Sequence, residues 1–278
     1  MLWSVNKKAE TSAGNVVWGS AGSGPPLVLA HGWPWSSFIW HRVLLSLSHG
    51  YSVYWYDMPG YGRSEKKEGQ ATGIDVQAKV FAEMLAIWDI DRPTVWAHDL
   101  SGAVALRAHL LDGVAFTNLI LMNCVALSPW GSEFFDHVGR HLDAFRPLPH
   151  HIHAAIVEAY IRSALVGEIA ETDLHELVLP WMSPEGQVSF YNQFAEADQA
   201  LTRAFEPKLG DIDCPVTLIW GEKDPWIPLE RGRALAAKIG VPLHHLPDAG
   251  HLPPLEAPRE LLDALIAIPD TLPELKGM

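Results

Sequence analysis

The sequence contains few cysteines, and they are far apart. Only 2 of its 278 residues are cysteine, Cys124 and Cys214, and both lie in apolar stretches that are typical of strands. Small buried thiols of this kind are common in proteins of reducing compartments, whereas disulfide-stabilised folds carry many more cysteines. We therefore expect two buried free thiols, with neither a disulfide nor a redox pair.

Positive charge is also scarce, because 20 Lys and Arg residues stand against 33 Asp and Glu residues and leave a net charge of −13. A nucleic-acid-binding protein usually presents a basic face, and an anionic bilayer repels an acidic surface. The first segment, MLWSVNKKAE, lacks the apolar run of a signal peptide, and no later segment has the length and apolarity of a transmembrane span. These absences predict a cytoplasmic protein with no nucleic-acid partner and no membrane association.

What the chain does contain is an alternation of short apolar runs with helical periodicity. Hydrophobic residues make up 48% of the sequence and charged residues 19%, which suits a folded α/β protein with a sizeable core. Short strands between helices predict a mostly parallel, eight-stranded sheet that is covered on both faces. The expected strands span residues 2–9, 15–20, 25–32, 51–57, 94–98, 118–127, 214–224 and 242–247. The expected helices of this core span residues 37–47, 74–89, 100–111, 229–239 and 258–268.

Residues 128–210 break this alternation. They contain helical stretches at 153–166 and 185–205 that are separated by several prolines. We interpret the segment as a helical lid inserted between two strands of the sheet, so that residues 1–127 and 211–278 form the core. The alternative is that the segment simply extends the core.

A carboxylate occupies the turn between the strand at 94–98 and the helix that follows. Asp99 stands there in the stretch TVWAHDLSGAVAL, with the small residues Ala97 and Ser101 on either side. A sharp strand-to-helix turn pushes its central residue outward and requires small neighbours two positions away. This pattern predicts that Asp99 is presented as a nucleophile, and it disfavours Ser101 in that role because Asp99 would crowd the turn. The structural alternative is that Asp99 only caps the helix.

Two further residues follow strands in the same way. Asp224 comes after the strand at 214–224, and His251 lies in a glycine-containing loop after the last short strand. Because catalytic groups collect at the carboxyl edge of such sheets, we expect the two residues to meet Asp99 there. Asp248 is a less favoured partner for His251. Asn123 stands where an alternative acid could lie, but its side chain is neutral.

Four motifs resemble those of α/β-hydrolases over nearly the whole chain. AHDLSG is similar to the nucleophile turn G-H-D-x-G of the branch that uses an aspartate nucleophile, and HGWPWSSFIW is similar to the dehalogenase pattern H-G-x-P-x-S-S-x-x-W. DMPGYGRS and DAGH resemble a turn and a histidine loop that occur across the fold. That branch contains haloalkane dehalogenases, epoxide hydrolases and fluoroacetate dehalogenases.

The resemblance implies an enzyme with a covalent, two-step mechanism. Asp99 would form an alkyl ester with the substrate, and His251, oriented by Asp224, would activate the water that cleaves this ester. The backbone N–H groups of Trp33 and Leu100 would hold the oxygen of the tetrahedral intermediate. The resemblance implies no metal and no cofactor, a small-molecule substrate, and a monomer or homodimer.

The sequence indicates the leaving group of the reaction less clearly than it indicates the nucleophile. Dehalogenation of a small haloalkane-like substrate is preferred because PWSSFIW is the best motif match, and Trp33 and Trp181 could donate N–H groups to the halide. The alternative for Trp181 is simple packing, because the chain has 12 Trp residues to place. Leu100 departs from the pattern, since dehalogenases place a Trp at that position. The alternative is an epoxide hydrolase, in which Tyr160 and Tyr191 of the lid would protonate the oxygen.

Other activities are disfavoured. Fluoroacetate dehalogenases carry an Arg at the position of Leu100, and their His-Trp pair corresponds to Ile161 and Arg162 here. A serine esterase based on Ser101 and a catalytically silent ligand receptor are less favoured rivals. The histidine-rich stretch at 150–153 is interpreted as a solvated part of the lid rather than as a metal site.

Overall fold

One eight-stranded sheet forms the centre of the computed structural model, which describes residues 2–276. Its strands lie in the order β1-β2-β4-β3-β5-β6-β7-β8. They are β1 Lys7–Thr11, β2 Gly14–Ala21, β3 Pro26–Ala30, β4 Ser52–Tyr56, β5 Thr94–His98, β6 Asn118–Met122, β7 Val216–Gly221 and β8 Leu243–Leu246. The pairs β1–β2 and β2–β4 are antiparallel and the other five pairs are parallel. The predicted fold class is therefore confirmed.

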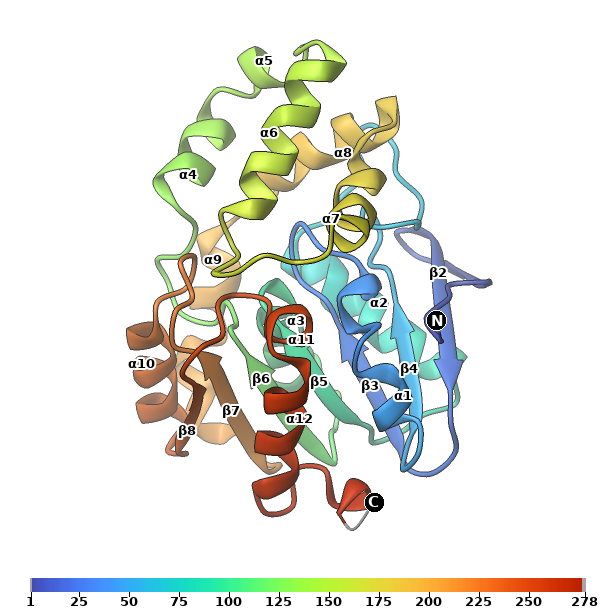
Figure 1. The fold of residues 1–278 in the computed structure, drawn as a ribbon, viewed down its shortest axis with the longest axis vertical. Coiled ribbons are helices and arrows are strands. Elements are labelled where there is room, and N and C mark those ends of the chain that lie inside the picture. The colour runs from blue at the N-terminus through green and yellow to red at the C-terminus, as the bar shows by residue number, and fades with distance from the viewer. Residues whose placement is uncertain (1, 277–278) are drawn as a thin grey trace.

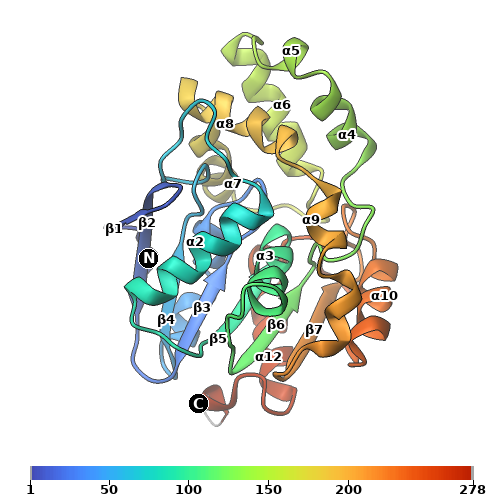
Figure 2. The same ribbon diagram turned by 180° about the vertical axis from the view of Figure 1, so that it is seen from behind.

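Helices cover both faces of this sheet. The helices α1, α11 and α12 lie on the face drawn in Figure 1, and α2 and α3 lie on the opposite face in Figure 2. The core helices are α1 Leu44–Leu47, α2 Ile74–Ile87, α3 Leu100–Leu110, α10 Leu229–Ile239, α11 Pro253–Glu256 and α12 Pro258–Ala267, with short 3-10 helices at Ser37–Trp40 and Pro273–Leu275. Because both faces are covered, every residue of β5 and β6 is buried, which explains their uninterrupted apolar runs.

The chain between β6 and β7 is helical and lies over the carboxyl ends of the parallel strands (Figure 1). Its elements are α4 Glu133–Arg140, α5 Leu142–Phe145, α6 His150–Arg162, α7 Glu171–Val178, α8 Pro184–Ala195 and α9 Gln199–Arg203, with 3-10 helices at Leu179–Trp181 and Glu206–Asp211. Ion pairs join α7 to the core: Arg42 Nη2 lies 2.6 Å from Asp173 Oδ2, and Arg63 Nη2 lies 3.0 Å from Glu176 Oε2. No helix within residues 2–276 has both the length and the apolarity to cross a bilayer.

Several expected elements differ in their bounds. The first strand begins at Lys7 instead of residue 2, because Trp3 leaves the sheet and its indole donates a hydrogen bond to Ser37 Oγ at 3.1 Å. The expected strand at 118–127 ends at Met122, since Asn123 turns the chain with a φ of 43°. The expected helices at 37–47 and 185–205 are each broken into two shorter ones. Both cysteines are free, but Cys214 is only half-buried.

Candidate active site

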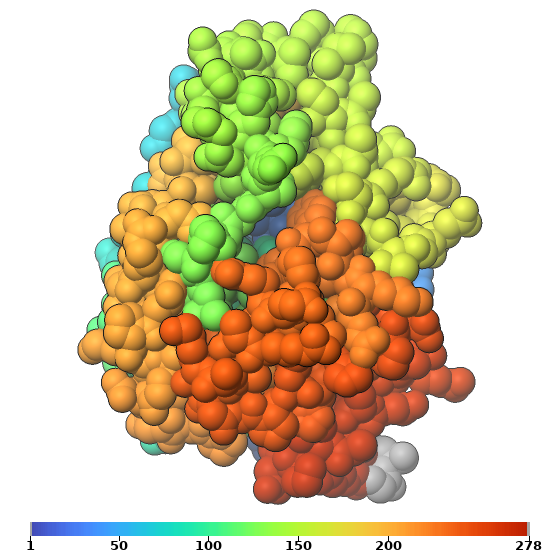
Figure 3. Space-filling view, turned by 90° about the vertical axis from the view of Figure 1, so that its left-hand side faces the viewer, coloured from blue at the N-terminus to red at the C-terminus, as the bar shows by residue number. Residues whose placement is uncertain are grey.

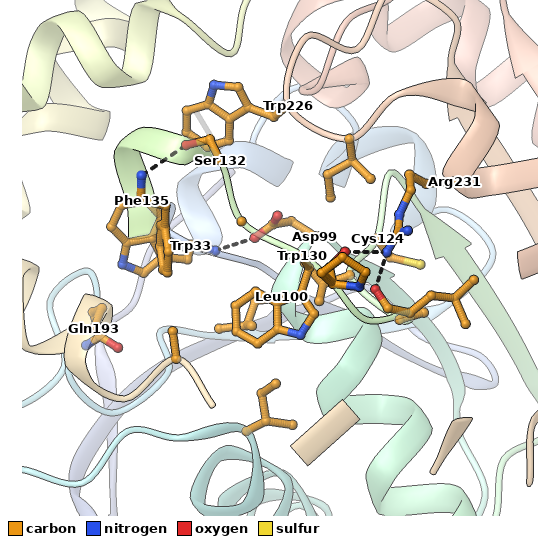
Figure 4. Close-up of a pocket in the computed structure, with 18 of the residues that line it drawn as sticks. Trp33, Asp99, Leu100, Cys124, Trp130, Ser132, Phe135, Gln193, Trp226 and Arg231 are labelled. Carbon is orange, nitrogen blue, oxygen red and sulfur yellow. Dashed lines mark hydrogen bonds between the residues drawn. The ribbon is translucent and has the colours of Figure 1, made fainter. Parts of the chain in front are cut away.

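Asp99 occupies a strained turn between β5 and α3. Its φ of 54° and ψ of −124° lie outside the regions that most residues adopt, and such strain persists where the surrounding structure enforces it. The side chain makes no capping hydrogen bond to α3, so the interpretation of Asp99 as a helix cap is wrong. Its Oδ1 instead accepts a hydrogen bond from the backbone N–H of Trp33 at 2.7 Å, the contact drawn in Figure 4.

Small neighbours make room for this carboxylate. A Cβ atom at Gly32 would lie 2.2 Å from Asp99 Oδ1, so the close approach of the two loops requires glycine there. Ser101 is fully buried, and its hydroxyl oxygen lies 2.7 Å from the carbonyl oxygen of Ala30 and 2.8 Å from that of His98, so it donates to these buried backbone acceptors. The Ser101 hydroxyl therefore points into the core, away from any position where it could attack a substrate.

His251 lies between two carboxylates. Its Nδ1 is 2.9 Å from Asp224 Oδ2, and its Nε2 is 3.4 Å from Asp99 Oδ2. The second contact is an ion pair rather than a well-formed hydrogen bond, because its geometry leaves Nε2 without a hydrogen-bond partner within residues 2–276. A hydrogen bond between His98 Nε2 and the backbone carbonyl oxygen of His251, at 2.7 Å, holds the loop that carries His251. The structure thus brings together the three residues that the sequence singled out.

Asn123 has a role that the sequence analysis did not assign. Its side-chain amide donates to Asp224 Oδ2 at 2.7 Å, and its Oδ1 accepts from the backbone N–H of Gly221 at 3.1 Å. The backbone N–H groups of Trp226 and Ile227 bind the other oxygen, Asp224 Oδ1, at 2.8 and 2.9 Å. Asn123 therefore helps to hold Asp224 in place and does not substitute for it.

The competing acid, Asp248, lies at the surface. Its side chain is 91% exposed and pairs with Lys223, 2.7 Å away. It is therefore Asp224, buried and hydrogen-bonded to the imidazole, that partners His251.

The two carboxylates change the proton affinity of His251. Burial on its own would lower the pKa of the imidazole, but the charge and hydrogen bond of Asp224, together with Asp99, outweigh it and raise the pKa of His251 to about 10. Burial likewise opposes the charge of Asp224, yet the nearby His251 and the hydrogen bonds to the carboxylate lower the pKa of Asp224. The contacts with Asp224 and Asp99 therefore favour the protonated form of His251.

A cavity of about 240 Å³ lies between the sheet edge and the helices above it. Asp99, Leu100 and Trp33 form part of its floor, and Tyr160 belongs to the helical part of its wall. Figure 3 shows a hollow between the green segment that follows β6 and the orange residues that follow β7. An enclosed cavity of about 150 Å³ holds a benzene-sized guest, so a somewhat larger small molecule fits this one. Most of the lining is apolar, which favours a largely apolar guest.

Trp33 connects the floor of the cavity to the helices above. While its backbone N–H binds Asp99, its ring packs against Phe135 and Phe194 with centroid distances of 5.3 and 4.8 Å. The indole nitrogen is buried and has no hydrogen-bond partner within the described residues. In Figure 4 this nitrogen lies on the side of the ring that is turned toward Gln193.

Two of the expected lid residues do not line the cavity. Trp181 is fully buried, and its indole N–H donates to the carbonyl oxygen of Pro34 at 2.9 Å. The hydroxyl of Tyr191 lies 3.2 Å from His153 Nδ1 in the interior of the helical segment, where burial raises the pKa of Tyr191 to about 12. The expectation that these two side chains face the substrate is therefore wrong, since both are committed to internal hydrogen bonds.

Tyr160 does line the cavity, as expected. The centroid of its ring lies 4.6 Å from the ring centroid of Trp226 and 5.1 Å from that of Trp33. Burial and then the charge of Asp99 raise the pKa of its phenol, against a smaller opposing effect of a hydrogen bond with Ser132. The phenol is therefore neutral and keeps its proton.

The cavity wall also contains polar residues that the sequence analysis missed. Tyr61 lies between two glycines in DMPGYGRS, a motif interpreted only as a turn of the fold. Arg231 of α10 donates hydrogen bonds to the carbonyl oxygens of Leu127 and Pro129, where the chain leaves the core (Figure 4). Nothing in the local pattern of α10 distinguishes Arg231 from a surface arginine.

Comparisons with known proteins agree with the fold. A solved α/β hydrolase fold protein from Burkholderia ambifaria is 40% identical, superposes with a TM-score of 0.92, and covers 96% of this chain and 98% of that one. A pimeloyl-acyl-carrier-protein methyl ester esterase of Photobacterium profundum is 28% identical, over 89% of this chain and 96% of the esterase. A soluble epoxide hydrolase of Corynebacterium sp. strain C12 is 40% identical over 88 residues, which is 31% of this chain and 30% of that enzyme. A model of the alpha/beta hydrolase family matches residues 27–264, and the chain is a hydrolase that belongs to this family.

Proposed function

We propose that the protein hydrolyses a small, largely apolar electrophile through a covalent ester of Asp99. One observation carries the proposal: the carboxylate of Asp99 lies on the cavity floor, held by the Trp33 N–H on one side and facing His251 on the other. A serine mechanism has no support here, because the Ser101 hydroxyl points into the core.

In the first step a carboxylate oxygen of Asp99 attacks a saturated carbon, and the electrons of the broken bond go to the leaving atom. In the second step water adds to the ester carbonyl while His251 takes a proton from it; the intermediate then collapses by breaking the bond to the alkyl oxygen, which takes the proton from His251 and leaves as an alcohol, and the carboxylate of Asp99 is regenerated. The backbone N–H groups of Trp33 and Leu100 stabilise the resulting oxyanion, an effect typically worth about 3–4 kcal/mol for each donor that is removed.

The protonation of His251 fits this order of events. In the free enzyme the imidazolium cannot act as a base, and the first step does not require one. Once Asp99 is esterified, one of the two carboxylates that raise the pKa of His251 loses its charge. His251 then gives up its proton more readily and can activate water at the stage where a base is needed.

The cavity supports an oxygen leaving group better than a halide. Tyr160 lies on the cavity wall and can protonate the oxygen of an epoxide as the ring opens. The second halide donor that the sequence suggested, Trp181, is hydrogen-bonded to Pro34 outside the cavity. We therefore favour epoxide hydrolysis. Dehalogenation of a small haloalkane remains the second candidate because the stretch PWSSFIW resembles the dehalogenase motif.

The test replaces His251 by Gln and incubates the variant with propyl oxirane or with butyl bromide. We expect an ester to accumulate on Asp99, because only its hydrolysis is blocked. Mass spectrometry of the peptide that contains Asp99 distinguishes the two reactions, since an epoxide adds its whole mass and a bromide adds only its alkyl group. The double variant that also carries Asp99→Asn is the control and should gain no mass. A His251→Gln variant that stays unmodified with both compounds would contradict the proposal.

A further inference from the structure

Helix α6 carries Tyr160, and its C-terminal end is bonded to a loop that holds other residues of the site. Ser163, the C-cap residue of α6, lies one turn after Tyr160. Its hydroxyl donates a hydrogen bond to the Tyr160 carbonyl oxygen at 2.6 Å and accepts one from the indole N–H of Trp226 at 3.0 Å. One hydroxyl thus joins the backbone of Tyr160 to a residue of the loop that follows β7.

Trp226 extends this connection to His251. Its backbone N–H donates to Asp224 Oδ1 at 2.8 Å, and the other carboxylate oxygen of Asp224 lies 2.9 Å from His251 Nδ1. The ring of Trp226, which lines the cavity (Figure 4), has its centroid 4.6 Å from that of Tyr160 and 5.2 Å from that of His251. Trp226 therefore packs against both residues to which the proposed function gives a proton transfer.

The loop after β8 is attached to the same end of α6. The backbone N–H of His251 donates to the Ala164 carbonyl oxygen at 3.3 Å. Glu256 bridges the two segments, because one of its carboxylate oxygens accepts from the Val166 N–H at 2.7 Å and the other from the Leu252 N–H at 2.9 Å. The end of α6 is therefore bonded to both loops that carry the partners of Asp99.

These bonds act where a helix is least constrained. The carbonyl oxygens of a last helical turn lack the donors that interior carbonyl oxygens have, and Tyr160 belongs to that turn of α6. The Ser163 hydroxyl supplies a donor to the Tyr160 carbonyl oxygen, while the Trp226 indole holds the hydroxyl in place. Ser163 is exposed and does not line the cavity, so any effect that it has on a substrate passes through another residue.

We propose that Ser163 is a positioning residue, which holds Tyr160 where its phenol can protonate the oxygen of an epoxide. The proposal rests on the proposed function and extends it, since it connects the acid of the first step to the base of the second through Trp226 and Asp224. As Asp99 attacks the carbon, the carbon–oxygen bond breaks and the oxygen takes the proton of the phenol. The proton released when the Asp99 carboxylate is regenerated restores the phenol.

The test uses two substrates that differ in their need for an acid. Bromide leaves as an anion and needs no proton, so the ratio of the propyl oxirane rate to the butyl bromide rate isolates the contribution of Tyr160. The rates of ester formation on Asp99 are measured in the His251→Gln protein and again after adding Ser163→Ala. We expect the ratio to fall about tenfold, because a small displacement of a reacting group is costly. Ser163→Thr keeps the hydroxyl and should restore most of the ratio.

Ser48→Ala is the matched control. Ser48 is the C-cap residue of α1, and its hydroxyl likewise donates to a carbonyl oxygen one turn back, that of Leu45 at 2.8 Å. Within residues 2–276 this hydroxyl has no bond to the cavity wall, so the ratio should not change. A double-mutant cycle gives the second control: after Tyr160→Phe, Ser163→Ala should have no further effect on the ratio, because Ser163 acts through the phenol.

Three results would overturn the positioning role of Ser163 while leaving the Asp99 ester intact. They are a ratio that Ser163→Ala leaves unchanged, an equal slowing of both compounds, and a fall in the ratio that is as large without the Tyr160 hydroxyl as with it. The absence of an ester from both compounds in the His251→Gln protein instead overturns the proposed function on which this role rests.

Discussion

Replacing Asp99 by Asn should lower the pKa of His251 by about 2 to 3 units. The Asn side chain is neutral, like the ester of the proposed intermediate, and it has nearly the same shape as the Asp side chain that it replaces. His251 Nε2 lies 3.4 Å from Asp99 Oδ2, and unit charges at that distance interact by roughly 5 kcal/mol at an effective dielectric constant of about 20. Spreading each charge over two atoms reduces this to about 3–4 kcal/mol, which corresponds to the stated shift.

The consequence for catalysis is direct. The pKa of His251, about 10 in the free enzyme, would be lower in the esterified enzyme and so nearer to the pH at which a general base works best. His251 would therefore be a poor base before Asp99 has reacted and an effective one afterwards.

Titration of the His251 imidazole by NMR measures the shift in the wild type and in Asp99→Asn. The control is Asp248→Asn, which removes an equal charge from the same loop, but from an exposed side chain that pairs with Lys223. We expect the control to leave the pKa of His251 within a few tenths of a unit. An equal shift in both variants, or none in Asp99→Asn, would refute the reasoning, because Asp99 would then exert no specific influence on His251.

Two further substitutions test where other side chains point. Ser101→Ala should lower the free energy of unfolding in urea by about 1–3 kcal/mol, because the hydroxyl binds only buried backbone groups. The rate of Asp99 ester formation should change by less than about twofold. A loss of activity of more than about a hundredfold would show that Ser101 is catalytic. Trp181→Phe should lower the free energy of unfolding by about 1–3 kcal/mol, because the hydrogen bond to Pro34 is lost. The ratio of the bromide rate to the epoxide rate should stay unchanged. A selective loss of the bromide reaction would show that Trp181 binds the halide.

The sequence was most informative where the structure is regular. The strand at 94–98 has the predicted bounds, because its five residues are all buried and the next helix begins at Leu100, directly after Asp99. The positions of Asp224 and His251 followed from the general rule that parallel strands present their carboxyl ends at one edge. These inferences needed only local pattern and the topology of the fold class.

Side-chain direction in the helical segment could not be predicted in the same way. Tyr191 and Gln193 both lie in α8 and both are buried, yet only Gln193 lines the cavity, so burial and periodicity do not separate the side chains that line the cavity from those that pack against other helices. Tyr61 was missed for a different reason: a G-Y-G turn explains the glycines, and nothing in the local pattern shows that the hydroxyl between them lacks a partner. Such facts depend on which elements meet in space.

The double attachment of Trp33 limits how the substrate range of this enzyme can change. Its amide fixes Asp99 while its ring is packed among aromatic side chains of α4 and α8. A substitution that enlarges the binding space by replacing those aromatic side chains with smaller ones also loosens Trp33, whose N–H holds the proposed nucleophile Asp99. Engineering for bulkier compounds should therefore begin on the side of Ile227 and Leu235, which line the cavity and have no hydrogen bond to the carboxylate of Asp99 within residues 2–276.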